Sequence, residues 1–67
     1  MSLEQAAERH PEWRLWRSGG GGLVGATRRR RLSDAELDAD LHTTLIEDDL
    51  DALIDRLREQ EDRERAL

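Results

Sequence analysis

Two apolar stripes in the C-terminal half of the chain would point in opposite directions on a single helix. At about 100° per residue, the first stripe lies within about 40° of Leu41, and the second lies about 120–220° away from it. The first stripe is Leu37, Leu41 and Leu45, and the second is Leu50, Leu53, Ile54 and Leu57. One straight helix over residues 34–66 would therefore bury both stripes only inside an oligomer.

A break in the helix near Asp48 and Asp49 resolves this conflict. Before the break, the β-branched residues favour a strand over residues 41–47. After it, the second stripe has the i, i+3, i+4, i+7 spacing of an amphipathic helix, which we expect over about residues 49–66 with fraying at 61–67. The long helix inside an oligomer stays open as the alternative.

Two capping boxes predict two short helices elsewhere in the chain. The pattern S-x-x-Q begins at Ser2 and the pattern S-x-x-E begins at Ser33. In a capping box, the serine and the residue three positions later each bond to the backbone N–H of the other. We therefore expect helices over residues 3–9, ended by Pro11, and over residues 34–40.

A glycine run between two strand-like segments predicts a β-hairpin. Residues 12–18 alternate in character, and residues 23–28 form the returning strand. The four glycines at 19–22 accept the positive φ angles that tight hairpin turns require. A plain turn explains them better than a phosphate-binding loop, because the Lys and Ser/Thr of such a loop are missing.

The length of the turn fixes which residues share a face of the sheet. A two-residue turn and a four-residue turn both pair Ser18 with Leu23, which places Trp16 opposite Gly25. A three- or five-residue turn would break this assignment. One face then carries Trp13, Leu15, Val24 and Ala26. The other carries Arg14, Trp16, Leu23, Gly25 and Thr27.

Together these elements predict an α+β fold in one small domain, residues 1–67. A short N-terminal helix precedes a three-stranded antiparallel sheet (hairpin 12–18/23–28 plus strand 41–47), which lies on the C-terminal helix. Self-association would add to so thin a core. The expected core consists of Leu3, Ala7, Trp13, Leu15, Val24, Ala26, Leu41, Leu45, Leu50, Leu53, Ile54 and Leu57.

The residue types that catalysis or metal binding needs are sparse. The chain has no cysteine, and His10 and His42 stand at no ligand spacing. The acidic run at residues 47–51 lacks the spacing of a calcium loop and fits helix capping. We therefore expect no enzyme activity, no metal and no cofactor. No secretory pattern or membrane-length apolar run is present, so we expect a cytoplasmic protein without membrane contact.

Charge is divided unevenly along the chain. Residues 1–31 hold seven arginines and three acids, a net charge of +4, whereas residues 32–67 hold four arginines and thirteen acids, a net charge of −9. A basic segment beside an acidic one can contact another macromolecule, or a second copy of the chain, by charge. The candidate contact residues are Arg14, Trp16, Arg17, Arg28, Arg29, Arg30 and Arg31.

These residues support two functional hypotheses. The first is a non-catalytic interaction or regulatory accessory protein that binds a protein partner, or itself, through the arginine-rich hairpin and an exposed Trp16. The alternative is a nucleic-acid-binding module, which the overall net charge of −5 disfavours. Purely structural interpretations compete with both hypotheses. The arginines could pair with the acids of residues 34–40, or they could stay solvated at a strand end. Trp16 could simply shield Gly25.

Several short motifs resemble a group of small uncharacterised proteins of high-GC Gram-positive bacteria. The similarity covers most of the chain but implies no activity. The order α-β-β-β-α also resembles the double-stranded-RNA-binding fold, although the acidic start of the last helix has the wrong sign for binding phosphates. The motifs of the bacterial group are His10-Pro11-x-Trp13-x-x-Trp16-Arg17-Ser18, Ala26-Thr27-Arg28, Thr44-Leu45, Asp48-Asp49-Leu50 and Leu53.

Overall fold

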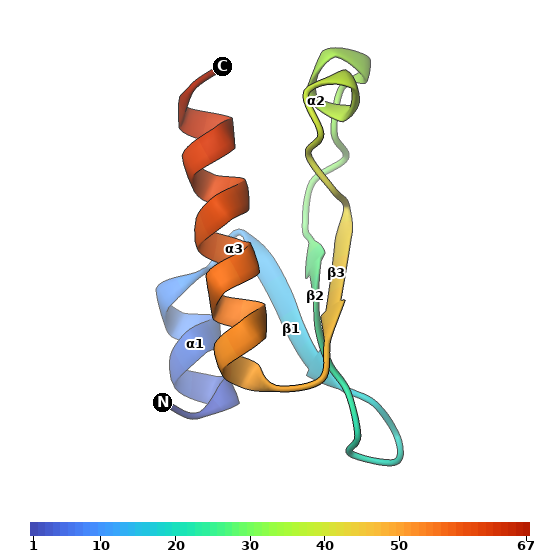
Figure 1. The fold of residues 1–67 in the computed structure, drawn as a ribbon, viewed down its shortest axis with the longest axis vertical. Coiled ribbons are helices and arrows are strands. Elements are labelled where there is room, and N and C mark those ends of the chain that lie inside the picture. Colours follow the sequence, from blue (N-terminus) through green and yellow to red (C-terminus); the bar gives the residue numbers. More distant parts are fainter.

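The computed structural model describes all of residues 1–67 and has an α+β fold (Figure 1). Its three strands form one antiparallel sheet in the order β1-β2-β3, so the predicted fold class is confirmed. The elements are α1 (Leu3–Arg9), β1 (Trp13–Arg17), β2 (Val24–Arg28), α2 (Asp34–Asp38), β3 (Thr44–Glu47) and α3 (Leu50–Arg65).

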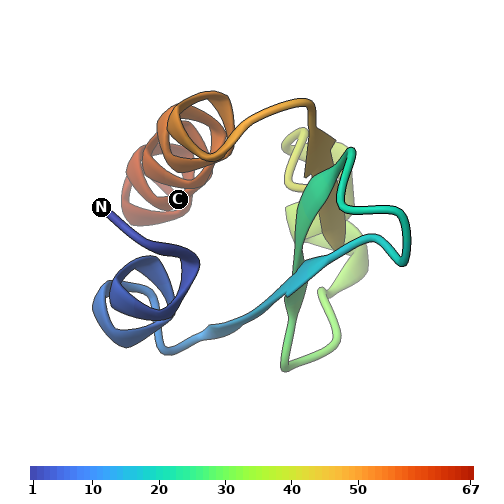
Figure 2. The same cartoon turned by 90° about the horizontal axis from the view of Figure 1, so that it is seen from below.

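The elements form two layers. Helices α1 and α3 lie on the same side of the sheet, where α1 packs against β1 and α3 packs against β2 and β3 (Figure 2). The short helix α2 stands beyond one end of the sheet, opposite the turn between β1 and β2 (Figure 1). We call the sheet face toward α1 and α3 the inner face and the opposite face the outer face.

Side-chain caps start the helices where the sequence predicts them. Ser2 accepts a hydrogen bond from the N–H of Gln5 at 3.1 Å, and Ser33 accepts one from Glu36 at 3.2 Å. Both reciprocal bonds of the capping boxes are present. At the start of α3, the Asp49 carboxylate accepts the N–H of Ala52 at 2.8 Å. Each cap satisfies a backbone donor that the first turn of a helix leaves without a partner.

The hairpin has the predicted register. The N–H of Ser18 donates to the carbonyl of Leu23 at 2.9 Å, which closes a turn of four glycines. Gly21 has φ 74°, a conformation that glycine adopts without steric cost. Trp16 lies opposite Gly25, as the sequence analysis predicts. The strands are slightly shorter than predicted: β1 lacks one residue at each end, and β2 begins one residue later.

The chain breaks between β3 and α3 at Asp48 and Asp49, so the single long helix is wrong. The third strand begins at Thr44 rather than at residue 41, which shortens the predicted strand by three residues. The reason is a side chain of α3: Gln60 accepts the N–H of His42 at 2.7 Å and donates to the carbonyl of Asp40 at 3.3 Å. These bonds hold the backbone before β3 against the helix.

The core lies between the inner face and the helices. Most of the predicted core residues are buried, but Ala6 is buried in place of Ala7, and Leu3, Leu15 and Leu50 are only partly buried. Leu32 is buried without having been predicted. The central cluster consists of Trp13, Val24, Ala26, Leu45, Leu53 and Leu57.

Candidate interaction surface

Arg28 is an interior residue. It follows Val24 and Ala26 on the inner face, and its side chain is only 2% exposed. The guanidinium lies 4.2 Å from the centre of the Trp13 ring, in a cation–π contact. It donates to the His42 carbonyl at 2.9 Å, to Glu64 at 2.7 Å and to Gln60 at 3.3 Å. The structure therefore removes Arg28 from the expected contact surface.

Arg30 is half-exposed and bound to two carboxylates. Its guanidinium donates to both oxygens of Glu36, at 2.9 and 2.6 Å, and to Glu64 at 3.0 Å. The hydrogen bonds from Arg30 and then from Ser33 lower the pKa of Glu36 to about 2. At Glu64, burial raises the pKa, but the combined bonds from Arg28 and Arg30 lower it overall. Pairing with acids, one of the interpretations left open above, holds for Arg30.

The remaining predicted arginines have no carboxylate within ion-pair distance. The side chain of Arg29 donates only to the backbone carbonyl of Pro11, at 3.2 Å, and Arg31 is exposed. Arg14 and Arg17 are also exposed on β1, but strand alternation places Arg14 on the outer face and Arg17 at the edge of the inner face. The seven predicted residues therefore do not form one continuous basic patch.

Trp16 covers a glycine on the outer face. A Cβ atom added to Gly25 would lie 2.2 Å from an atom of the Trp16 ring, so the indole rests directly on the backbone of β2. The indole N–H donates to the hydroxyl of Thr27 at 3.1 Å, and Thr27 lies 3.5 Å from the hydroxyl of Thr44. Shielding of Gly25 is thus what the geometry shows. The indole stays half-buried, because no helix lies on this face.

Two exposed aliphatic side chains extend the indole surface. Ile46 lies opposite Gly25 on β3 and is 51% exposed, and Leu23 at the start of β2 is 40% exposed. The nearest carboxylate of β3, that of Glu47, turns toward the inner side and bonds to Arg56 at 2.7 Å. We call this group the outer-face patch: Arg14, Trp16, Leu23, Thr27, Thr44 and Ile46.

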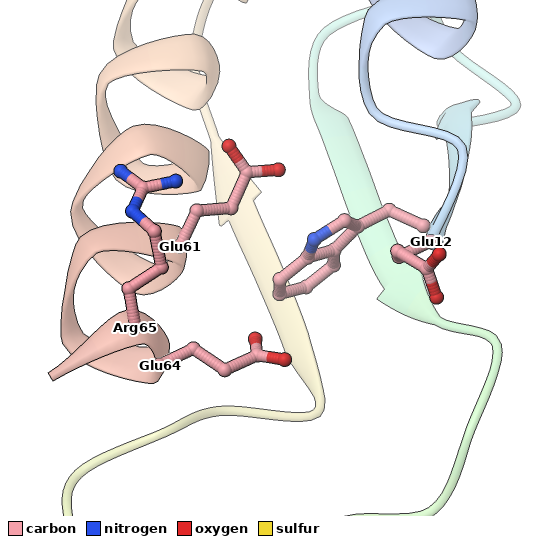
Figure 3. Close-up of a pocket in the computed structure, with 5 residues that line it drawn as sticks. Glu12, Glu61, Glu64 and Arg65 are labelled. Carbon is pink, nitrogen blue, oxygen red and sulfur yellow. The ribbon is translucent and has the colours of Figure 1, made fainter. Parts of the chain in front are cut away.

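The structure also has one open cavity of about 440 Å³ between the start of β1 and α3 (Figure 3). Glu12 lies on one side of it, and Glu61 and Glu64 project from α3 on the other. Glu61 lies 2.8 Å from the Nδ1 atom of His10, so the helix carboxylates already have partners within the protein. The lining residues are Glu12, Trp13, Glu61, Glu64 and Arg65.

The structure gathers no set of side chains typical of a metal site. No cluster of three or more His, Asp or Glu side chains is placed to hold a metal ion. The lining of the cavity consists of carboxylates, one indole and one guanidinium. None of the helices combines the length and the apolar composition that crossing a bilayer requires.

Comparison with known proteins adds no relative: no family model, curated protein or solved structure matches this chain. The resemblance to small proteins of Gram-positive bacteria stays a prediction. The candidate surface is therefore defined by geometry and chemistry alone.

Sequence reasoning placed Leu23 on the face opposite Trp13 but did not identify Ile46 as an exposed apolar residue. Leu45 was placed in the core, so alternation along a strand would have put its neighbour Ile46 on the opposite face. The buried polar residues His10 and Gln60 were missed for another reason. Their partners are 51 residues away for His10 and 18 or more for Gln60, beyond the reach of local patterns.

Proposed function

We propose that this chain is a non-catalytic interaction protein that binds a protein partner through the outer-face patch. The observation that carries the proposal is the exposure of Ile46 and Leu23 beside Trp16, on a sheet face that no helix covers. Tryptophan and arginine are enriched in binding hot spots, and the aliphatic side chains beside them add apolar area that a partner can bury. Arg14 supplies that arginine, with no carboxylate bound to it.

The arginine run supports nucleic-acid binding less well. Affinity for nucleic acid depends on guanidinium groups that are free to neutralise phosphates. Two of the four consecutive arginines, Arg28 and Arg30, bond to carboxylates of the chain itself. The net charge of −5 adds a general repulsion. We also propose that the protein acts in the cytoplasm.

The decisive experiment compares partner capture by the wild-type chain and by the Ile46→Thr variant. Threonine keeps the β-branching that suits a strand, so the fold is expected to survive while exposed apolar area is lost. After capture from host extract, the partner is identified and its affinity is measured by titration calorimetry with purified proteins. We expect binding to weaken about tenfold in the variant.

Arg58→Gln on α3 is the control, because Arg58 is exposed and makes no ion pair. Equal binding by the wild type and Ile46→Thr would refute the proposal. A separate titration with labelled DNA and RNA at about 50 mM salt tests the alternative: binding that falls steeply as salt rises would favour a nucleic-acid module.

A further inference from the structure

We infer that the partner on the outer-face patch is a second copy of this chain, which docks its helix α2 there. The inference rests on the proposed function, because it uses the same surface. In this contact, Leu37 of one copy packs on Trp16 and Ile46 of the other, and Asp38 lies near Arg14.

Helix α2 offers a leucine between two free carboxylates. Asp34, Leu37 and Asp38 are spaced i, i+3 and i+4, so they share one side of the helix. Leu37 is 49% exposed, and both aspartates are exposed without an ion pair. The helix itself is held in place from elsewhere, because Glu36 bonds to Arg30 and to the backbone of Ser33.

The outer-face patch has the complementary chemistry. It presents an indole and two aliphatic side chains, it contains no carboxylate, and Arg14 stands on the same face as Trp16 without an acidic partner. An apolar side chain flanked by carboxylates matches this surface both in hydrophobicity and in charge. The rest of the chain is acidic, so this patch is a favourable place for an acidic segment.

The exposed apolar residues point to the same pairing. Apart from the terminal Met1 and Leu67, the large hydrophobic side chains that remain exposed are Leu23, Leu37 and Ile46. The proposed contact brings all three together and removes them from water. Burial of apolar area is the main favourable term in association, and a core of this size gains from it.

The contact has to form between two molecules. Helix α2 stands beyond one end of the sheet, whereas Leu23 follows the turn at the other end (Figure 1). A chain therefore cannot lay its own α2 on its own patch without unfolding the connections to β2 and β3. In a dimer with a two-fold axis, each copy docks its α2 on the outer-face patch of the other. If the contact instead repeats in one direction, it gives an open head-to-tail oligomer.

Sedimentation velocity and light scattering between about 10 µM and 1 mM test the inference directly. We expect the mass to rise with concentration from the 7.7 kDa of one chain to at least twice that value. Leu37→Ser is expected to weaken association about tenfold without unfolding the protein, because Leu37 is exposed on a surface helix. The matched control is Ala35→Ser, an exposed position on the same helix outside the proposed contact.

Charge reversal gives an independent test. The variants Arg14→Glu and Asp38→Arg are each expected to dissociate. An equimolar mixture of the two is expected to associate again, because opposite charges then meet in the contact between them. The controls Arg58→Glu and Asp55→Arg change net charge equally at exposed positions on α3.

The results separate this inference from the proposed function. A wild-type mass of one chain at about 1 mM, or association that Leu37→Ser leaves unchanged, would overturn the second-copy assignment. In either case, loss of an identified partner by Ile46→Thr would still support the proposed function. The inference is supported if the wild type forms a dimer or a larger oligomer and Leu37→Ser abolishes that association.

Discussion

The contact between Trp16 and Gly25 predicts that Gly25→Ala will destabilise the wild-type protein but stabilise a variant that lacks the Trp16 indole. Gly25→Ala places a methyl group 2.2 Å from the indole, so the ring has to move away. In a variant that already carries Trp16→Ala, the space is free. Alanine then replaces glycine inside a strand, which favours the folded state.

The magnitudes follow from the contacts that move. Displacing the indole breaks its 3.1 Å hydrogen bond to Thr27, worth about 0.5–1.5 kcal/mol. It also exposes part of a half-buried aromatic ring, at about 1 kcal/mol. Alanine in place of Gly25 raises the free energy of unfolding by roughly 0.5–1 kcal/mol, because it restricts the unfolded chain. Gly25→Ala should therefore destabilise the wild type by about 0.5–2 kcal/mol and stabilise the Trp16→Ala variant by about 0.5–1 kcal/mol.

Urea unfolding of the four proteins, followed by far-UV circular dichroism, measures this double-mutant cycle. Fluorescence is unsuitable because Trp16→Ala removes one of the two tryptophans. Gly22→Ala is the control, since a Cβ there meets no atom within 4 Å and its effect should not depend on Trp16. We expect a coupling free energy of about 2 kcal/mol. Equal effects of Gly25→Ala in both backgrounds would refute the close contact.

Two further predictions concern the arginines. Arg28→Ala should lower the free energy of unfolding by about 2–4 kcal/mol, since it removes a buried cation–π contact and three hydrogen bonds, whereas Arg29→Ala should change it by less than about 0.5 kcal/mol in the same urea assay. Because the folded-state pKa of Glu36 is lowered to about 2, its bonds to Arg30 stabilise the fold above its ordinary pKa of 4.5, and this stability is lost as the pH falls from about 5 toward 2. Glu36→Gln should flatten stability against pH in that window in acid titrations, and an unchanged slope would contradict the assignment.

Some parts of the fold were readable from the sequence because they depend on neighbours within a few residues. The capping boxes at Ser2 and Ser33, the glycine turn and each of the two leucine stripes depend on residues that lie close together in the sequence. The register of the hairpin followed from the length of its turn alone. For these elements, local geometry leaves few alternatives, and the structure agrees with it.

The candidate surface was less readable. The sequence analysis identified Trp16 and the arginines as candidates. Four consecutive arginines suggest one basic patch, but their side chains point in different directions once the strand alternation and the following bend are known. Alternation along β2 sends Arg28 to the inner face, and the following bend brings Arg30 to Glu36 and Glu64. The partners of Arg28 on α3 lie more than 30 residues away, so no local pattern could have identified them.

The sequence by itself determined the elements, the position of the break before the last helix and the two faces of the hairpin, because periodicity, caps and turn length are local properties. The sequence also predicted that the face of Trp13 is the buried one, and only the tertiary structure decided what covers that face and where the neighbouring arginines lie. Both helices pack on the face of Trp13, since the apolar stripe of α3 and the inner residues of all three strands can be buried together there. That packing leaves Trp16 and Ile46 facing water and places Arg28 inside, a division that depends on contacts between distant parts of the chain.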